Sequence, residues 1–211
     1  MRLLVIGASQ GVGALTVTAA LERGHAVTAF ARSPHKLTLE HPSLTRSVGD
    51  FHDAASVDAA VPGHDAVIIT ASASSLKGFK DDPTFFSRGT GLVIDAMQRH
   101  GVRRLVVLSA LGTGDSRVLF NFLLRKLVLD LVLARPYQDH ERQEQLVHGC
   151  GLDWVIARPS KLTNGPARKR SKKTTTIEPV PSSISRADVA DFLVEACASD
   201  VWLGHAVQLG G

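Results

Sequence analysis

Residues 3–13 read LLVIGASQGVG and carry the clearest structural signal in the chain. The apolar run Leu3–Ile6 predicts a buried β-strand, and Val12–Arg23 predicts a helix that begins among the glycines. Glycine allows a tight turn and a close approach of the backbone to a ligand. The first N–H groups of a helix attract an anion. Strand, glycine-rich turn and helix in this order therefore predict a binding site for the pyrophosphate of a dinucleotide.

The rest of the chain repeats this alternation of short apolar strands and longer helices, which is typical of a parallel sheet covered on both faces. With 211 residues, of which 44% are hydrophobic, we predict one doubly wound α/β domain, a Rossmann fold, over residues 1–211. Further strands are predicted at Ala26–Ala31, Leu44–Val48, Ala66–Ala71, Arg104–Ser109, Leu152–Ala157 and Ala206–Leu209. Further helices are predicted at Ala54–Val61, Pro83–His100, Gln138–His148 and Arg186–Ala198.

Glycine marks three of the expected helix ends. Gly24, Gly101 and Gly149 each follow a predicted helix, where glycine can enter the left-handed region without steric cost. Asp53 precedes another predicted helix, and we expect its side chain to cap that helix.

The end of the second strand indicates which dinucleotide is preferred. Arg32 follows this strand, at the position where an acidic side chain would accept the ribose 2′-hydroxyl of NAD. A guanidinium there accommodates the 2′-phosphate of NADP instead, because it binds phosphate with two parallel hydrogen bonds. Lys36 adds a second positive charge. We therefore predict NADP(H) as the cofactor, held by Arg32, Lys36 and the turn residues Gly7, Ser9, Gln10, Gly11, Val12 and Gly13.

Composition and charge exclude several classes of protein. The net charge is only +4, from 24 Lys and Arg against 20 Asp and Glu, so the surface as a whole does not predict nucleic-acid binding. Cys150 and Cys197 lie far apart, so neither a disulfide framework nor a zinc site is predicted. The N-terminus lacks the pattern of a signal peptide, and polar residues interrupt the apolar stretch Val118–Ala134. We expect no membrane span and a reducing, cytoplasmic setting.

Several motifs, in this order along the chain, resemble those of a known family. They are the turn 7–13, Phe30-Ala31-Arg32-Ser33, Gly49-Asp50-Phe51, Asp65-Ala66-Val67-Ile68, Gly101-Val102-Arg103-Arg104-Leu105-Val106-Val107-Leu108-Ser109 and Trp154-Val155-Ile156-Ala157-Arg158-Pro159. Together they resemble the atypical short-chain dehydrogenase/reductase family of NAD(P)H-binding proteins. That family includes flavin reductases of the biliverdin reductase B type and, more distantly, NmrA-like regulators. The resemblance covers nearly the whole chain and is specific for fold and cofactor, not for substrate.

The resemblance implies roles for the residues at matching positions. Two pairs would contact the adenosine half of the cofactor: Asp50 with Phe51 at the adenine ring, and Ala71 with Ser72 beside it. By itself, Asp50 is equally compatible with a simple turn residue. On the nicotinamide half, the resemblance implies Ser109 beside the ring and the backbone turn Arg158-Pro159 in support of it.

Two departures limit what the resemblance implies. Many relatives space the turn as Gly-x-x-Gly-x-x-Gly, whereas this chain has Gly-x-x-x-Gly-x-Gly, and both spacings suit phosphate. Ser160 and Lys161 stand where biliverdin reductase B carries a proline and a histidine. Reduction of a tetrapyrrole therefore does not follow from the resemblance.

The catalytic pair of ordinary short-chain dehydrogenases, Tyr-x-x-x-Lys, is missing. Its lysine favours the tyrosine phenolate, but the only tyrosine, Tyr137, is followed four residues later by Glu141. This disfavours alcohol–ketone oxidoreduction and epimerisation. It leaves NADPH-dependent reduction of a small conjugated or aromatic acceptor, flavin- or quinone-like, in which cofactor and positioning do most of the work. We expect Ser109 to orient substrate or nicotinamide and Lys161 to offer a charge or a proton.

A competing hypothesis is a non-catalytic NADP(H)-binding redox sensor of the NmrA-like type, which passes cofactor occupancy to a protein partner. Consumption of NADPH with a panel of flavins and quinones separates the two hypotheses. Binding without consumption favours the sensor.

Three further features are interpreted as structural. A charged cluster is formed by Asp139, His140, Glu141 and Glu144, in which His140 and Glu144 lie one helical turn apart. No residue supplies a clear third metal ligand, so a charged helical face with local pairs is predicted and no metal site. The basic run Arg168–Lys173 lacks aromatic partners for nucleic acid, which favours a mobile solvated loop. The apolar stretch Val118–Arg135 suits a pocket wall or a contact in a homodimer, with core packing as the alternative.

Overall fold

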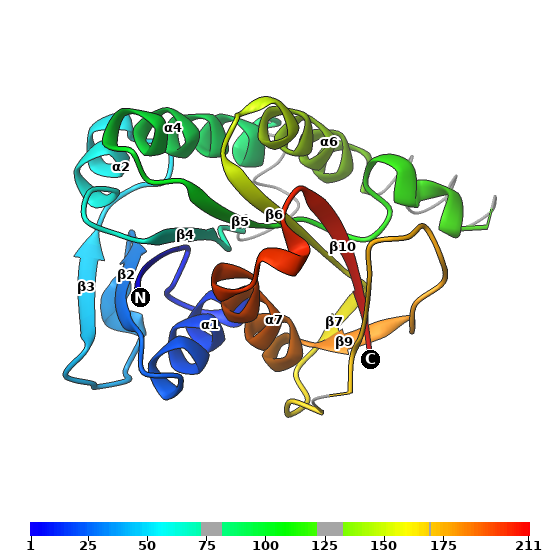
Figure 1. The fold of residues 1–211 in the computed structure, drawn as a ribbon, viewed down its shortest axis with the longest axis horizontal. Coiled ribbons are helices and arrows are strands. Elements are labelled where there is room, and N and C mark those ends of the chain that lie inside the picture. Colours follow the sequence, from blue (N-terminus) through cyan, green and yellow to red (C-terminus); the bar gives the residue numbers. More distant parts are fainter. Residues whose placement is uncertain (73–81, 122–132, 169) are drawn as a thin grey trace.

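The computed structural model describes residues 1–72, 82–121, 133–168 and 170–211. Its main sheet has eight strands in the order β3-β2-β1-β4-β5-β6-β10-β8, and a second, two-stranded sheet pairs β7 with β9 (Figure 1). Neighbouring strands of the main sheet are parallel, except that β8 runs antiparallel to β10. The strand order reverses between β1 and β4, which is the topological switch point of a doubly wound fold. The predicted Rossmann fold is confirmed.

The elements have the following bounds. The strands are β1 (Arg2–Ile6), β2 (Ala26–Ala31), β3 (Leu44–Val48), β4 (Ala66–Ile69), β5 (Arg104–Leu108), β6 (Asp153–Pro159), β7 (Lys161–Thr163), β8 (Lys172–Thr174), β9 (Ser183–Ser185) and β10 (His205–Gly210). The α-helices are α1 (Gly11–Glu22), α2 (Ala54–Ala60), α4 (Phe85–His100), α6 (Ala134–Gly149) and α7 (Arg186–Ala198). Short 3-10 turns are η1 (Pro34–Lys36), η2 (Gly114–Leu119) and η4 (Asp200–Trp202).

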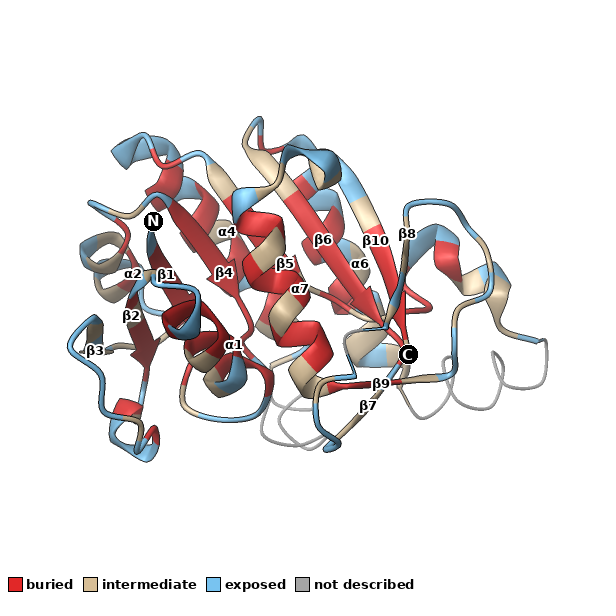
Figure 2. Ribbon diagram, turned by 60° about the horizontal axis from the view of Figure 1, so that its bottom comes forward, coloured by how far each residue is buried: buried red, intermediate tan, exposed pale blue. Residues whose placement is uncertain are grey.

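Helices cover both faces of the sheet. α1 and α7 pack on one face, and α2, α4 and α6 pack on the other (Figure 1). The middle strands are buried on both sides, as Figure 2 shows for β1, β4, β5 and β6. Successive residues of a strand point to opposite faces, so Leu3 and Val5 join the core under α1 and α7, while Leu4 and Ile6 join the other core. This explains why the strands read as continuous apolar runs.

The helix ends follow the predicted chemistry in all but one case. Gly24 and Gly101 have φ of +76° and +69° and follow α1 and α4. The Asp53 carboxylate accepts a hydrogen bond from Ser56 N at 3.1 Å and so caps α2. The prediction for Gly149 is wrong, because α6 continues through it and Gly151, with φ +68°, takes the left-handed conformation instead.

The basic run is only partly a loop. Lys172 and Lys173 belong to β8, which pairs with the C-terminal strand β10. The Lys173 ammonium also forms an ion pair with Glu195 on α7. The predicted mobile, solvated loop is therefore wrong for this part of the run, because strand pairing and an ion pair fix it; Lys169 lies outside the described residues.

The apolar stretch Val118–Arg135 is described only at its two ends. Val118 lies exposed in η2, and α6 begins at Ala134, four residues before the predicted start. Residues 122–132, which hold most of the stretch, lie outside the described residues. Across the described ranges, no helix has the length and apolar character needed to cross a membrane.

Candidate functional site

A pocket opens beyond the carboxyl ends of β1, β2, β3 and β4, at the switch point of the sheet. This is where ligands bind in open α/β sheets. The residue that closes it on the α4 side is Phe85, at the start of that helix. The full lining is Ile6, Gly7, Ser9, Gln10, Phe30, Ala31, Arg32, Ser33, Lys36, Gly49, Asp50, Phe51, Ala71, Ser72 and Phe85.

The glycine-rich turn forms the floor of this pocket, and two of its glycines are sterically required. Gly7 has φ +86°, and a Cβ there would lie 2.7 Å from the backbone of Ala71. A Cβ at Gly13 would lie 2.6 Å from Thr70 Oγ1 and closer still to the carbonyl oxygen of Gly7. Glycine therefore lets α1 start directly against β1 and β4, which leaves the first turn of the helix facing the pocket.

Two cations lie on the rim of the pocket, where a 2′-phosphate is expected. Arg32 follows β2, and Lys36 ends η1 four residues later. Both side chains are exposed, and within the described part of the chain neither forms an ion pair. Ser33 lines the pocket between them. The residues present thus fit a phosphorylated adenosine: unpaired positive charge at the end of β2 and no carboxylate in that position.

An aromatic cluster forms the wall beside Asp50. Phe51 is buried and fills the space above Gly89 of α4, where a Cβ would overlap its ring. Its ring centroid lies 6.0 Å from that of Phe85, and His52 lies edge-on to Phe85 at 4.6 Å. The Asp50 carboxylate accepts a hydrogen bond from His52 N at 2.9 Å, which shapes the turn. The wall therefore offers apolar rings and one carboxylate to a bound base.

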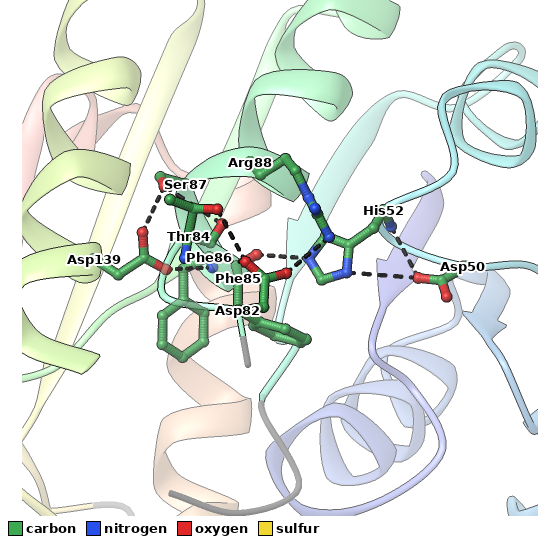
Figure 3. Close-up of polar contacts among 9 residues, drawn as sticks. All are labelled: Asp50, His52, Asp82, Thr84, Phe85, Phe86, Ser87, Arg88 and Asp139. Carbon is green, nitrogen blue, oxygen red and sulfur yellow. Dashed lines mark hydrogen bonds and ion pairs between the residues drawn. The ribbon is translucent and has the colours of Figure 1, made fainter. Parts of the chain in front are cut away.

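The start of α4 is held from both sides (Figure 3). On one side, His52 Nε2 donates to the carbonyl oxygen of Phe85 at 2.7 Å. On the other side, Asp139 of α6 accepts hydrogen bonds from Phe86 N at 2.6 Å and from the Ser87 hydroxyl. A negative charge at a helix N-terminus is favourable, and this one is fully buried. The clamp fixes the helix end that carries Phe85.

Asp82, just before α4, adds a partly exposed carboxylate to this clamp. Its carboxylate accepts a hydrogen bond from Thr84 N at 3.1 Å and pairs with Arg88 at 2.8 Å (Figure 3). Burial acts to raise the pKa of Asp82, but the hydrogen bonds from Thr84 and the charge of Arg88 hold it below its ordinary value.

A second polar network lies at the carboxyl ends of β5 and β6. Ser109 donates its hydroxyl proton to Glu144 Oε1 at 2.6 Å. Glu144 also binds the Arg158 guanidinium through both oxygens, at 3.0 and 2.6 Å, and both side chains are 3% exposed. Arg158 pairs in addition with Asp115. Burial opposes the charge on Arg158, yet the bonds to Glu144 and Asp115 raise its pKa above the ordinary value.

This network shows that the predicted charged face of α6 is largely buried. Asp139, His140 and Glu144 are buried, and together with Gln143 they pack against α4 and the end of β5. The spacing is that of one helix face, but each side chain there has a polar partner, so the face can be buried. Glu141 has a partly exposed ion pair with Arg117, and Asp139 pairs with the partly exposed Arg142. No metal-binding group of His, Cys, Asp or Glu occurs among the residues that the structure describes.

Tyr137, the only tyrosine of the sequence, is half-buried and bonds to the backbone. Its hydroxyl donates to the carbonyl oxygen of Leu111 at 3.0 Å, and burial raises its pKa. Its position ties the first turn of α6 to the segment after β5.

The structure brings together most of the predicted binding residues and leaves the rest outside the pocket. Inside are Gly7, Ser9, Gln10, Arg32, Lys36, Asp50, Phe51, Ala71 and Ser72. Gly11, Val12 and Gly13 start α1 behind the turn. Ser109, Arg158 and Pro159 lie at the ends of β5 and β6, and Lys161 is exposed at the start of β7.

Sequence reasoning missed other contributors. Ser33 and Phe85 line the pocket, His52 and Asp139 hold α4, and Glu144 neutralises Arg158. For Ser33 a signal existed, because it directly follows Arg32. Phe85, His52, Asp139 and Glu144 come together through tertiary packing of segments far apart in the chain, so no local sequence pattern predicts their roles.

Comparison with known proteins identifies the family of this chain. The family model described as NAD(P)H-binding matches residues 7–200, a range that holds every residue of the pocket lining except Ile6. The protein belongs to this NAD(P)H-binding family. The UPF0659 protein YMR090W of Saccharomyces cerevisiae is 27% identical over 211 residues, covering 93% of this chain and 86% of that protein. A 3-beta-hydroxysteroid dehydrogenase of Mycolicibacterium neoaurum is 39% identical over 113 residues, 50% of this chain. The match spans only 31% of that longer protein.

Solved structures share the fold over the full chain. ChuY, an anaerobillin reductase from Escherichia coli O157:H7, superposes with a TM-score of 0.81 at 23% identity, covering 100% of this chain and 97% of that one. A short-chain dehydrogenase/reductase from Veillonella parvula in complex with NADP gives a TM-score of 0.80 at 17% identity, with coverage of 100% and 94%. At these identities the likeness is one of fold.

Proposed function

We propose that this protein is an NADPH-dependent reductase of a small conjugated acceptor, flavin- or quinone-like. One observation carries the proposal: Arg32 and Lys36, without ion-pair partners among the described residues, lie on the rim of the pocket that the glycine-rich turn floors. Two cations at the end of β2 favour a 2′-phosphate over a bare ribose. The fold shared with an NADP complex and with a reductase supports the same proposal.

The side chains have distinct parts in this proposal. The turn residues bind the pyrophosphate, Arg32 and Lys36 bind the 2′-phosphate, and the wall at Asp50 and Phe51 receives the adenine. When bound, NADPH supplies the hydride. Ser109 gives its own proton to Glu144, so we propose that its oxygen accepts a hydrogen bond and orients the nicotinamide amide. Arg158 and Pro159 support that end of the cofactor, and Lys161 attracts an anionic acceptor from the rim of β7.

Calorimetry with NADPH and NADH tests the cofactor assignment. A lost charge-assisted hydrogen bond costs about 1.5–3 kcal/mol, so Arg32→Asp should weaken NADPH binding by about 10- to 100-fold and leave NADH binding nearly unchanged. Arg170→Asp, at an exposed cation outside the pocket, is the matched control and should bind NADPH like wild type. Equal affinity of wild type for NADPH and NADH would refute the assignment.

A second function, a redox sensor without turnover, is favoured by one specific observation. Ser109 is committed to Glu144, and Lys161 lies exposed outside the pocket, so the two residues expected to act on an acceptor are not gathered around it. Incubation of the protein with NADPH and FMN, FAD or a benzoquinone decides between the two. Oxidation of NADPH above the rate without protein supports the reductase, whereas tight binding with no oxidation supports the sensor.

A further inference from the structure

His140 is the ionisable side chain on the buried face of α6 that the proposed function leaves unused. It is 9% exposed and stacks on Phe86 of α4, with ring centroids 3.9 Å apart and an interplanar angle of 17°. Its neighbours on the same helix face, Asp139 and Glu144, have structural partners. The imidazole of His140 bonds through Nδ1 to Gln143 of the same helix, which leaves the role of its other nitrogen to be explained.

Its position is bracketed by two contacts of α6 with the carboxyl end of β5. One helical turn later, Glu144 binds Ser109, and one turn earlier, Tyr137 binds the carbonyl oxygen of Leu111. Four helical residues span only about 6 Å. His140 therefore lies between these two contacts along α6, with its ring packed on Phe86 of α4. This places it close to the edge of the sheet where the nicotinamide half of the cofactor is expected.

Hydrogen bonds fix which nitrogen of His140 can take part in chemistry. Nδ1 lies 2.9 Å from Gln143 Oε1, and Gln143 Nε2 donates to Thr90 Oγ1 at 2.9 Å. Because the amide nitrogen of Gln143 is occupied by Thr90, its oxygen faces the imidazole and Nδ1 must carry the proton. Nε2 has no hydrogen-bond partner within the described ranges 1–72, 82–121, 133–168 and 170–211. Such orientation of one nitrogen by a further side chain is the usual arrangement of an acid–base histidine.

We propose that His140 donates the proton that completes reduction of the acceptor, an inference that rests on the proposed reductase function. Hydride from NADPH forms a C–H or N–H bond at one atom of the conjugated acceptor, and the electron pair moves to a second heteroatom. Nε2–H of the imidazolium breaks and its proton binds that heteroatom. The products are NADP⁺, the dihydro acceptor and neutral His140, which regains a proton from solvent.

The charges around His140 set the sign of the pH dependence. Burial lowers its pKa below the ordinary value of 6.5, while the bond to Gln143 and the charges of Glu144 and Asp139 oppose that shift. Behind Glu144 lie Arg158 and Asp115, and Arg142 lies 3.5 Å from Asp139. α4 presents uncharged Phe86 and Thr90 on this side. The donor form is the protonated one, so kcat for reduction should rise as the pH falls through the pKa of His140, in the range below 6.5.

The test compares kcat, its pH profile and NADPH affinity in His140→Gln with those in His148→Gln, an exposed histidine on the same helix. General acid catalysis contributes about 10²- to 10⁴-fold. We expect kcat with a flavin or quinone to fall by about 10²-fold or more in His140→Gln, the rise at low pH to disappear, and the Kd for NADPH to stay unchanged. His148→Gln should keep the wild-type profile. A wild-type kcat and pH profile in folded His140→Gln would overturn the proposal while leaving the reductase function intact.

A second variant keeps the inference testable if His140→Gln does not fold. Gln143→Met retains the imidazole but removes the hydrogen bond that raises its pKa, so the rise in kcat should move to lower pH. An unmoved profile would overturn the proposal. If wild type binds NADPH but reduces none of the acceptors, the reductase function fails and the role of His140 fails with it.

Discussion

At Gly13 the space open to a side chain is smaller than a methyl group. The hydrogen there faces the carbonyl oxygen of Gly7 and the hydroxyl of Thr70, which itself donates to the carbonyl oxygen of Ile6 at 2.8 Å. At Gly11, by contrast, nothing lies within 4 Å of a built Cβ, and only the φ of +61° disfavours other residues. Packing thus requires glycine at position 13, and backbone conformation requires it at position 11.

Alanine at these two positions should separate the two requirements. Gly11→Ala should cost about 1–2 kcal/mol, the price of a left-handed backbone with a Cβ. Gly13→Ala should destabilise the fold more than Gly11→Ala, because its Cβ would overlap backbone atoms that cannot move away, and such overpacking costs about 1–3 kcal/mol or more. It should also weaken NADPH binding. Urea unfolding and calorimetry measure both effects. Equal losses at the two positions would contradict this division.

Single residues also show how far sequence reasoning reaches. The turn and Arg32 were predictable because their neighbours along the chain define their environment. Asp50 and Phe51 needed the family resemblance, since nothing in Gly49-Asp50-Phe51 alone says that the ring packs over Gly89. The partnership of Glu144 with Arg158 was hidden, because fourteen residues and a change from helix to strand separate the two.

At the scale of elements, α6 shows why a polar pattern misleads. Charged residues at helical spacing usually face solvent, yet here they meet the end of β5 and the start of α4 with hydrogen bonds for their polar atoms. Burial of such a face is tolerated only when the charges are paired. The pattern of α6 gives its helical period correctly, but whether the polar side faces water depends on what the neighbouring elements present.

The pair between α6 and β6 should therefore be sensitive to loss of one partner. Glu144→Gln leaves the Arg158 guanidinium buried with Asp115 as its remaining counter-ion, and removal of one partner of a buried pair costs about 3–5 kcal/mol. We expect a loss near the lower figure in the free energy of unfolding in urea. Glu141→Gln, whose pair with Arg117 is partly exposed, should cost less than about 1 kcal/mol. A loss in Glu144→Gln as small as that of Glu141→Gln would show that the buried pair contributes little.

For the whole molecule, the folded state responds to pH in two separate ranges. The pKa of His140 is lowered by burial, so the folded chain prefers the neutral ring, and the stability present above pH 6.5 is lost as the pH falls below it. His25 contributes in the same direction, because burial and the N-terminal charge lower its pKa too. Asp58, Asp82 and Asp153 have pKa values below the ordinary 3.8, so their contribution is lost only at more acidic pH.

Thermal unfolding across pH should show this as a shallow fall of Tm below pH 6.5 and a second fall below 3.8. His140→Gln should remove part of the first fall and leave the second unchanged. Calorimetry at a series of pH values measures both. A Tm that rises as the pH drops from 7 to 5 would contradict the sign derived from the buried imidazole. This pH range is chosen because it includes the ordinary histidine pKa of about 6.5.

The alternation of strands and helices made the parallel sheet and the helical layers on both of its faces predictable, because βαβ units produce this arrangement. The antiparallel β8 escaped prediction, because its Lys-Lys-Thr sequence has little of the β-branched, apolar character that marks a strand. Pairing with β10, across a long stretch of chain, makes it one.

Strand β8, at the edge of the main sheet, affects how readily separate molecules associate in solution. A sheet that ends in unpaired backbone groups offers a template on which further chains can add, and lysines on a short terminal strand oppose such growth. Here the terminal strand is three residues long and carries Lys172, whose ammonium binds the carbonyl oxygen of Pro179 at 2.9 Å. A strand from a second molecule would lie beside this lysine and reduce the hydration of its charge. A short edge strand that bears lysine therefore disfavours the addition of a second chain at this end of the sheet.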